Sequence, residues 1–268
     1  MRGRRHSSAG IRRGIRAMPD SLSSVPILGF TTGLVMRLES DLANVTLVGS
    51  SPTRVSAIVD TSASASAHDH AQALEVSQPL WNVAQVNGYT SVHCATPRGM
   101  TAAAHADFAV GTDSWLWWSV VRRPTAGTYS VFRGFGSNAS ADAVRVFVRS
   151  DEKLAISYGT DGQFYTGSTA SFPNDTWTFA VAGIDSSTGE VIYKIGANAI
   201  ERFSVTVSGT GASTVDATLH GDAAGAYRGD SFHCREEAFH KLGAVAVNDS
   251  DIDAIGTYVQ EKYGIATS

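Results

Sequence analysis

The feature that most constrains this chain is a series of short segments in which apolar and polar residues alternate. The clearest are residues 129–133, 143–149, 154–158, 177–182, 190–195 and 201–207. Alternation with a period of two is the pattern of a β-strand that buries one face. Glycine and small polar residues separate these segments at 134–137, 161–162, 185–189 and 209–211, which is the composition of turns. Many short strands at this spacing predict an all-β sandwich or barrel.

One helix is expected, at the C-terminal end of the chain. Asp249 or Ser250 is suited to cap it, and Gly264 follows its last turn. Four apolar residues would form its buried stripe: Ile252, Ile255, Tyr258 and Val259. A shorter helical turn is predicted around residues 37–44.

Composition is consistent with one globular domain. The chain has 268 residues, of which 43% are hydrophobic and 17% charged, so a core of ordinary size needs neither disulfides nor a metal for stability. Cys94 and Cys234 are the two cysteines, and two buried thiols are favoured over one disulfide. No apolar run reaches about 18 residues and no apolar stretch follows the basic N-terminus, so we expect neither a membrane span nor a secretory signal.

Charge is distributed unevenly along the chain. The first acidic residue is Asp20, and the 15 basic residues that follow the N-terminal segment are outnumbered by 25 acidic ones. We therefore divide the chain into a basic arm and linker, residues 1–33, and a domain, residues 34–265. The arm is predicted to anchor the domain to an acidic protein partner. Nucleic acid is less favoured, because no aromatic residues are interleaved with the arginines. The anchoring residues would be Arg2, Arg4, Arg5, Arg12, Arg13 and Arg16.

Three passages resemble the concanavalin A-like lectin/glucanase (laminin G-like) modules. The first resembles their opening strand and a "V-x-x-W-x-D" strand, with Ile58 in place of the aromatic residue. The second is similar to their "Q-P-x-W … x-N-G-x-x-x-V-x-F" passage, with Cys94 in place of phenylalanine. The third is similar to their last strand and closing helix. In chain order the passages are residues 33–38 with 54–60, 78–81 with 86–94, and 241–247 with 251–265.

This resemblance implies a jelly-roll β-sandwich with a short C-terminal helix behind an extended N-terminal arm. Such modules occur in secreted bacterial proteins and in virion proteins of tailed bacteriophages. We expect a non-enzymatic virion structural protein, either a minor tail or a capsid decoration component, that displays a lectin-like module and binds other virion proteins through its arm. It would be made in the host cytoplasm and belong to a multi-subunit assembly. The alternatives are a carbohydrate-active hydrolase or a free secreted lectin of the same fold. The host, the glycan and the position on the particle stay open.

The carboxylates do not form the site of the related glucanases. Those enzymes carry Glu-x-Asp-x-x-Glu on one strand, which places a nucleophile and an acid on one face. Here Glu236 and Glu237 are consecutive and would face opposite sides of a strand, and Asp151 and Glu152 fall at a turn. We interpret all four as solvated charges and predict no catalytic residue.

No cofactor and no metal ligand are predicted. The pairs His93-Cys94 and His233-Cys234 would each offer only one ligand, because neighbours on a strand point to opposite faces. Asp185 begins the sequence Asp-Ser-Ser-Thr-Gly, which is typical of a hairpin turn rather than a calcium loop.

Aromatic residues give the one indication of a ligand site. The valines within residues 144–148 would form a core face, so Arg145, Phe147 and Arg149 would point away from it. Together with Trp117 on a neighbouring strand, they would make a platform on which a sugar ring stacks. The favoured alternative is that both faces are covered, one by the second sheet and one by loops or a neighbouring subunit.

Overall fold

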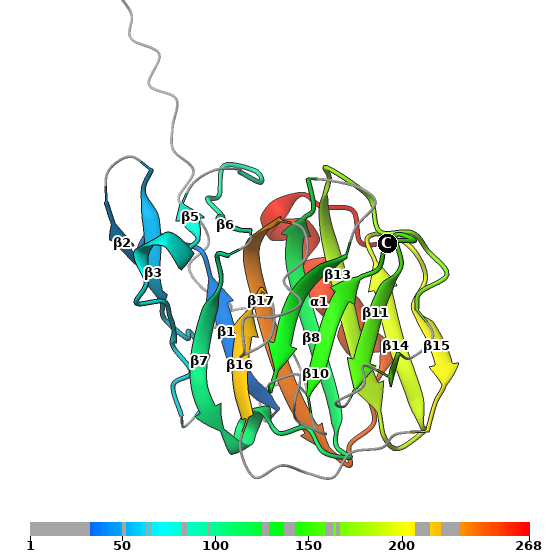
Figure 1. The fold of residues 1–268 in the computed structure, drawn as a ribbon. Coiled ribbons are helices and arrows are strands. Elements are labelled where there is room, and N and C mark those ends of the chain that lie inside the picture. Colours follow the sequence, from blue (N-terminus) through cyan, green and yellow to red (C-terminus); the bar gives the residue numbers. More distant parts are fainter. Residues whose placement is uncertain are drawn as a thin grey trace, which may run out of the picture.

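The computed structural model describes residues 33–49, 52–62, 64, 66–81, 85–95, 97–124, 129–136, 143–158, 163–164, 167–206, 215–220 and 231–268. These residues form an antiparallel β-sandwich with one C-terminal helix, as the alternation predicts (Figure 1). The basic arm, with Arg2, Arg4, Arg5, Arg12, Arg13 and Arg16, and the turns expected at 161–162 and 209–211 lie outside the described residues. Within the described part, no helix combines the length and apolar character needed to cross a bilayer.

Two sheets make up the sandwich. The back sheet has the order β1 (Leu34–Glu39), β17 (Phe232–Gly243), β8 (Ser114–Arg122), β13 (Trp177–Asp185), β14 (Glu190–Ile195) and β15 (Glu201–Ser204). The front sheet has the order β4 (His70–Ala71), β7 (Met100–His105), β16 (Val215–Leu219), β9 (Ser130–Phe135), β10 (Val144–Val148), β11 (Leu154–Tyr158) and β12 (Gln163–Phe164).

Shorter elements connect the two sheets. The connecting strands are β2 (Val45–Val48), β3 (Arg54–Ile58), β5 (Leu80–Trp81) and β6 (Val92–Cys94), and pairing runs from β4 through β3, β5 and β6 to β17. Two 3₁₀ turns, η2 (Glu75–Ser77) and η3 (Ala106–Phe108), lie in the loops. The helix α1 (Asp249–Tyr263) covers the outer face of the back sheet (Figure 1).

Strand β8 contributes side chains to two hydrophobic cores. Trp115 and Trp117 belong to the core between the sheets, whereas Leu116 and Trp118 belong to the core between the back sheet and α1. Successive side chains of a strand alternate between its faces, so a central strand covered on both faces must be apolar throughout. All nine residues of β8 except Arg122 are buried. This is the reason that the tryptophan-rich segment occurs in the middle of the fold.

The buried apolar stripe predicted for the C-terminal helix is confirmed. Ile252, Ile255, Tyr258 and Val259 are all buried against the back sheet. Each fully buried side chain of this size contributes about 1.5–3 kcal/mol, so α1 is part of the core. Gly264 ends the helix with a φ of 69°, a left-handed conformation that glycine adopts without steric cost.

Three local predictions are wrong in detail. Residues 37–44 hold no helix; β1 pairs with β17 instead, because Met36 and Leu38 gain a place in the core. The helix N-cap is Asn248, and the predicted cap Asp249 instead lies inside the first turn and binds Arg202. The turn expected from Gly134 begins later, since β9 continues to Phe135 in its pairing with β10.

Candidate functional site

The predicted aromatic platform is covered. Val144, Val146 and Val148 do face the core between the sheets, so the expected division of faces on β10 is confirmed. Phe147, on the other face, is nevertheless fully buried, and its ring lies 4.8 Å from that of Tyr129. It clusters there with Val131 and Ala155 of the neighbouring strands.

The other three members of the predicted platform are not brought together on the surface either. Arg145 is 3% exposed. Trp117 is buried between the sheets, stacks on Phe132 and donates its indole N–H to Glu237 at 3.0 Å. Only Arg149 is substantially exposed, and it pairs with Asp151. The favoured alternative, that both faces are covered, is confirmed for Phe147 and Arg145, and the expectation of an exposed row is wrong, because alternation identifies the two faces of a strand and not what covers them.

An open groove of about 650 Å³ lies beside Trp177, away from the predicted platform residues. Residues 176–178, 195–198 and 263–266 line it, together with Val86, Ser171 and Pro173. Trp177 is the first residue of β13 and pairs with Arg122, the last residue of β8, so it sits where the back sheet ends. The groove thus forms between a strand start, the turn after β14 and the C-terminal tail.

The tryptophan in this groove is partly exposed but held in place. Its indole N–H donates to the carbonyl of Gln85 at 3.0 Å. The turn before it is fixed by Asp175, whose amide donates to Arg123 O at 2.7 Å and whose carboxylate accepts from Arg122 at 2.6 Å. A fixed, partly exposed indole offers an apolar face to a ligand at little entropic cost.

Short polar side chains flank the indole. Thr176, Thr178 and Asn198 all line the groove, and the last two are oriented by hydrogen bonds to backbone carbonyls at 3.0 and 2.9 Å. An aromatic face beside hydroxyl and amide groups matches a sugar ring, which has an apolar face and a polar rim. The alternation of residues 177–182 places Trp177 at a strand start, but no sequence pattern indicates that the C-terminal tail returns to form a wall beside it.

Two stacked imidazoles lie at the same end of the sheet. His93 of β6 and His233 of β17 are opposite each other in register, with ring centroids 4.4 Å apart, and the ring of His233 is 6.3 Å from that of Trp177. Burial, followed by the nearby His93 and Arg122, lowers the pKa of His233 to about 3. Both buried cysteines, Cys94 and Cys234, are thiols that belong instead to the core between the sheets, so the predicted separation of each His-Cys pair is confirmed.

The adjacent glutamates of β17 are not solvated as predicted. Glu236 and Glu237 are 0% and 1% exposed, although they do turn to opposite faces. Glu236 faces α1, where it accepts from Arg37 at 2.9 Å and Lys262 at 3.1 Å and also contacts Tyr263. Burial opposes ionisation, but these cations and the hydroxyl hold the pKa of Glu236 below its ordinary value. The charge is buried because its partners are buried with it.

A second carboxylate lies directly across from Glu236. Glu39 of β1 is its partner in the β1–β17 register. Burial and the charge of Glu236 raise the pKa of Glu39, so one carboxyl group of the pair is raised and the other lowered. Such a divergence is the electrostatic pattern of an acid and a base. Here, however, α1 covers the pair, Glu39 is 7% exposed, and Lys262 bridges both carboxylates at 3.1 Å.

The remaining acidic residues singled out in the sequence lie in turns, as predicted. Asp185 accepts hydrogen bonds from the amides of Ser187 and Thr188, and Gly189 has a φ of 68°. These are the local contacts of a hairpin turn, as predicted. Asp151 and Glu152 lie in the turn before β11, as predicted, and Asp151 is exposed, but Glu152 is half-buried and pairs with the buried Arg123, so its prediction as a solvated charge is wrong.

No protein-family model matches the chain, and no curated protein matches it in sequence. Solved structures do match in fold. A binding domain of botulinum neurotoxin DC in complex with SialylT has a TM-score of 0.52 at 11% identity, and the match covers 86% of this chain and 52% of that one. A structure titled for botulinum neurotoxin type C and its interaction with two ganglioside molecules has a TM-score of 0.51 at 11% identity, covering 87% and 53%.

A sialidase from Trypanosoma rangeli in complex with sialic acid has a TM-score of 0.55 at 15% identity, covering 88% of this chain and 34% of the sialidase. The chain thus spans about half the length of the two botulinum neurotoxin chains and about a third of the length of the sialidase. At such low identities the likeness establishes the fold alone. That fold is a concanavalin A-like β-sandwich, which confirms the architecture implied by the sequence resemblance.

Proposed function

We propose that this chain is a non-enzymatic, lectin-like binding module and that the groove beside Trp177 holds a saccharide. The observation that carries the proposal is the partly exposed indole, fixed by Gln85 and flanked by Thr176 and Asn198 in an open groove of about 650 Å³. Stacking on an aromatic face combined with hydrogen bonds at the rim is how proteins recognise sugar rings.

The structural neighbours support the class of ligand. Two of them are described in complex with SialylT or sialic acid, and a third in connection with gangliosides. Because the match covers 52% or less of the first and last of these chains, their ligand sites are not transferred to this chain residue by residue. We propose a saccharide from the geometry of the groove and take sialylated glycans as the first class to test.

A binding role is favoured over hydrolysis by the position of the carboxylates. Glycoside hydrolysis needs two carboxyl groups that flank the scissile bond. Among the described residues that line the groove, none is Asp or Glu. The one cross-strand pair with diverging pKa values, Glu39 and Glu236, lies under α1. Incubation with polysaccharides should therefore release no new reducing ends; their appearance would favour the alternative hydrolase.

The setting we propose is a virion. The support is the resemblance to phage-borne modules together with the charge of the arm, which concentrates six arginines before Asp20 while the rest of the chain is acidic. The arm would bind other virion proteins, and the sandwich would be displayed. If so, mass spectrometry of density-purified particles from cultures that produce the protein should find it at a fixed ratio to the coat protein. Recovery only in the free protein fraction would favour a free lectin.

Substitution of Trp177 tests the groove. Trp177→Ala removes the stacking face and should weaken binding to the best ligand of a glycan array about tenfold, since one aromatic stack with its buried area is worth roughly 1–2 kcal/mol. Trp177→Phe keeps a ring and should retain most of the affinity. Leu42→Ala, at a 70% exposed position outside the groove, is the matched surface control. A folded Trp177→Ala protein with unchanged binding to every glycan would remove the groove from consideration.

A further inference from the structure

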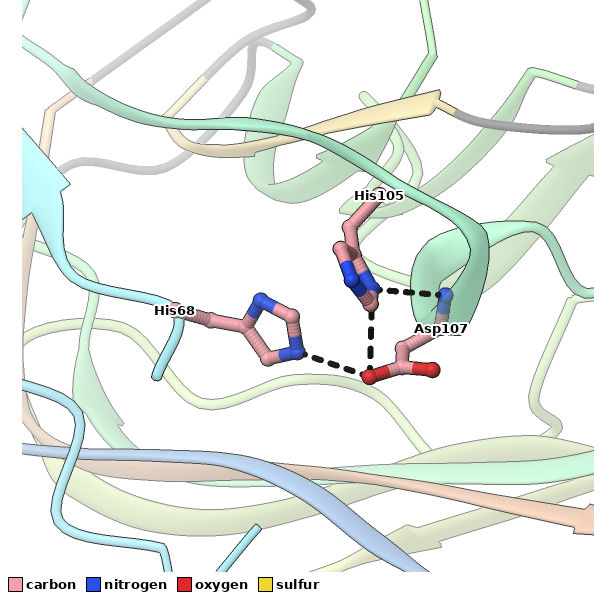
Figure 2. Close-up of side chains that lie close together, drawn as sticks. All are labelled: His68, His105 and Asp107. Carbon is pink, nitrogen blue, oxygen red and sulfur yellow. Dashed lines mark hydrogen bonds and ion pairs between the residues drawn. The ribbon is translucent and has the colours of Figure 1, made fainter. Parts of the chain in front are cut away.

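Three side chains that the groove does not use converge at another place (Figure 2). His68 lies in the segment before β4, His105 is the last residue of β7, and Asp107 lies in η3. The Nε2 atom of His68 is 3.0 Å from Oδ2 of Asp107, and Nδ1 of His105 is 3.1 Å from the same oxygen. Their ligand atoms all lie within 4.8 Å of one another. Segments far apart in sequence thus direct two imidazoles at one carboxylate.

The hydrogen bonds inside this cluster conflict with one another. The amide of Asp107 donates to Nδ1 of His105 at 3.2 Å, so that nitrogen presents a lone pair. The same nitrogen faces the carboxylate oxygen of Asp107, which is also an acceptor. A proton on Nδ1 would satisfy the carboxylate but lose the amide. A cation bound by both atoms would also displace the amide from Nδ1, but it would replace the repulsion between the nitrogen and the carboxylate oxygen by attraction to each of them.

The spacing suits a small transition-metal ion. Zinc binds histidine nitrogen at about 2.0–2.1 Å and carboxylate oxygen at about 2.0–2.2 Å, so ligands at a tetrahedral angle are about 3.3 Å apart. The two contacts to Asp107, at 3.0 and 3.1 Å, are close to this value. The widest separation, up to 4.8 Å, must close by about 1.5 Å. The side chain of His105 is 41% exposed and has room to make that adjustment.

The innermost ligand is held in advance. His68 is 4% exposed, and its ring lies 4.5 Å from that of Phe108. Its amide donates to Asp60 at 3.0 Å, and its carbonyl accepts from Nδ1 of His70 at 2.9 Å. Metal-binding histidines are oriented by such outer contacts, which reduce the cost of assembling the site.

We propose that His68, His105 and Asp107 bind one zinc ion, with a water molecule in the fourth position. Two imidazoles and one carboxylate are ligands for zinc rather than for calcium or magnesium, which prefer oxygen. The ion would join the segment before β4 to the end of β7. The ion would lie near the Ser114 end of β8, whereas the groove lies at the Arg122 end. The zinc site is therefore independent of the proposed saccharide site. The sequence predicts no metal because His68 is 37 residues from His105 and fits no ligand motif.

Titration of the metal-stripped full chain with zinc tests the site. We expect one zinc ion bound per chain after desalting. A ligand that binds only the folded state raises Tm, here by roughly 5–10 °C at a zinc concentration about 100 times Kd. Magnesium at the same concentration should leave Tm unchanged. Cobalt in place of zinc should give the visible absorption bands of a four-coordinate ion.

Variants locate the ion. His105→Ala and Asp107→Asn change partly exposed ligands and should each abolish both the stoichiometric zinc and its effect on Tm. His93→Gln removes a histidine of β6 outside the cluster and should bind zinc like the unaltered chain. Near-ultraviolet circular dichroism checks that each variant is folded. Failure of the unaltered chain to retain zinc, or full retention by folded Asp107→Asn, would overturn the proposal.

Discussion

The two faces of β17 bury a glutamate in different ways. Toward α1, Glu236 is shared by Arg37 and Lys262, with tyrosine hydroxyls completing its contacts. Toward the core between the sheets, Glu237 contacts the guanidinium of Arg133 and accepts from the indole of Trp117. One face thus distributes a carboxylate over several cations, and the other depends on a single arginine. The lesson is that equal burial does not imply equal tolerance of change.

A β-bulge in β17 brings two neighbouring charged residues to the face toward α1. The register of β17 against β8 shifts between Cys234 and Glu236, so Arg235 and Glu236 are not divided between the two faces as alternation requires. Arg235 turns to the helix side, where it binds Asp41 at 2.7 Å and lies over the ring of Tyr89. A bulge re-aims side chains in this way. The ion cluster under α1 therefore depends on a local break in the pattern.

The face toward the core between the sheets, where Glu237 depends on Arg133, should lose more stability when its glutamate is changed. Glu237→Gln keeps the shape but removes the carboxylate that pairs with Arg133, whose side chain is 0% exposed and has no other carboxylate partner among the described residues. Removing one member of a buried ion pair costs about 3–5 kcal/mol. Urea unfolding should show that loss in the free energy of unfolding. The double variant Glu237→Gln with Arg133→Met should recover part of it, and no recovery would show that the pair is not the cause.

The face toward α1, where two cations share Glu236, should lose less stability when its glutamate is changed to glutamine. In Glu236→Gln, Arg37 and Lys262 both keep Glu39 as a partner. The expected loss is therefore about 1–3 kcal/mol, closer to that of a buried hydrogen bond to a charged group than to that of an isolated charge. The decisive measurement is the order of the two variants under identical conditions. A larger loss for Glu236→Gln than for Glu237→Gln would reverse the comparison.

The sequence predicts the elements of the fold better than the surfaces around them. Residues 154–158 and 190–195 are strands with the predicted bounds, and Gly264 ends the helix as expected. These features depend on local periodicity and on backbone conformation, which neighbouring residues determine. The alternation within residues 144–148 also assigns each side chain to the correct face.

Contacts between distant segments are what the sequence does not reveal. Phe147 is covered rather than exposed, and Glu236 is buried rather than solvated. Trp177 gains its groove from the C-terminal tail, and His68 meets Asp107 across the fold. The partners of Glu236, Trp177 and His68 lie tens of residues away, and those of Phe147 lie on the neighbouring strands or just before them, so neither propensity nor charge pattern indicates them. The platform was therefore predicted on a face that other residues cover, while the groove and the histidine cluster needed the structure.

A third polar residue of β17, His233, affects the stability of the fold in a pH-dependent way. Burial and the nearby His93 and Arg122 lower the pKa of His233 from 6.5 to about 3, and the carboxylate of Asp175 offsets only part of this effect. Because the folded pKa lies below the unfolded value, the unfolded chain binds more protons between pH 6.5 and about 3. Stability is therefore lost as the pH falls through that window, by about 2 kcal/mol between pH 7 and pH 5. His233→Gln cannot titrate and should reduce the slope of this part of the stability profile, measured by urea unfolding at each pH, by that amount, while His70 and His93, whose pKa values burial also lowers, keep the remainder. The loss below about pH 4.5 that comes from Glu236, whose lowered pKa has the same sign of effect, should persist in the variant. An identical slope between pH 7 and pH 5 in both proteins would show that His233 does not stay neutral when folded.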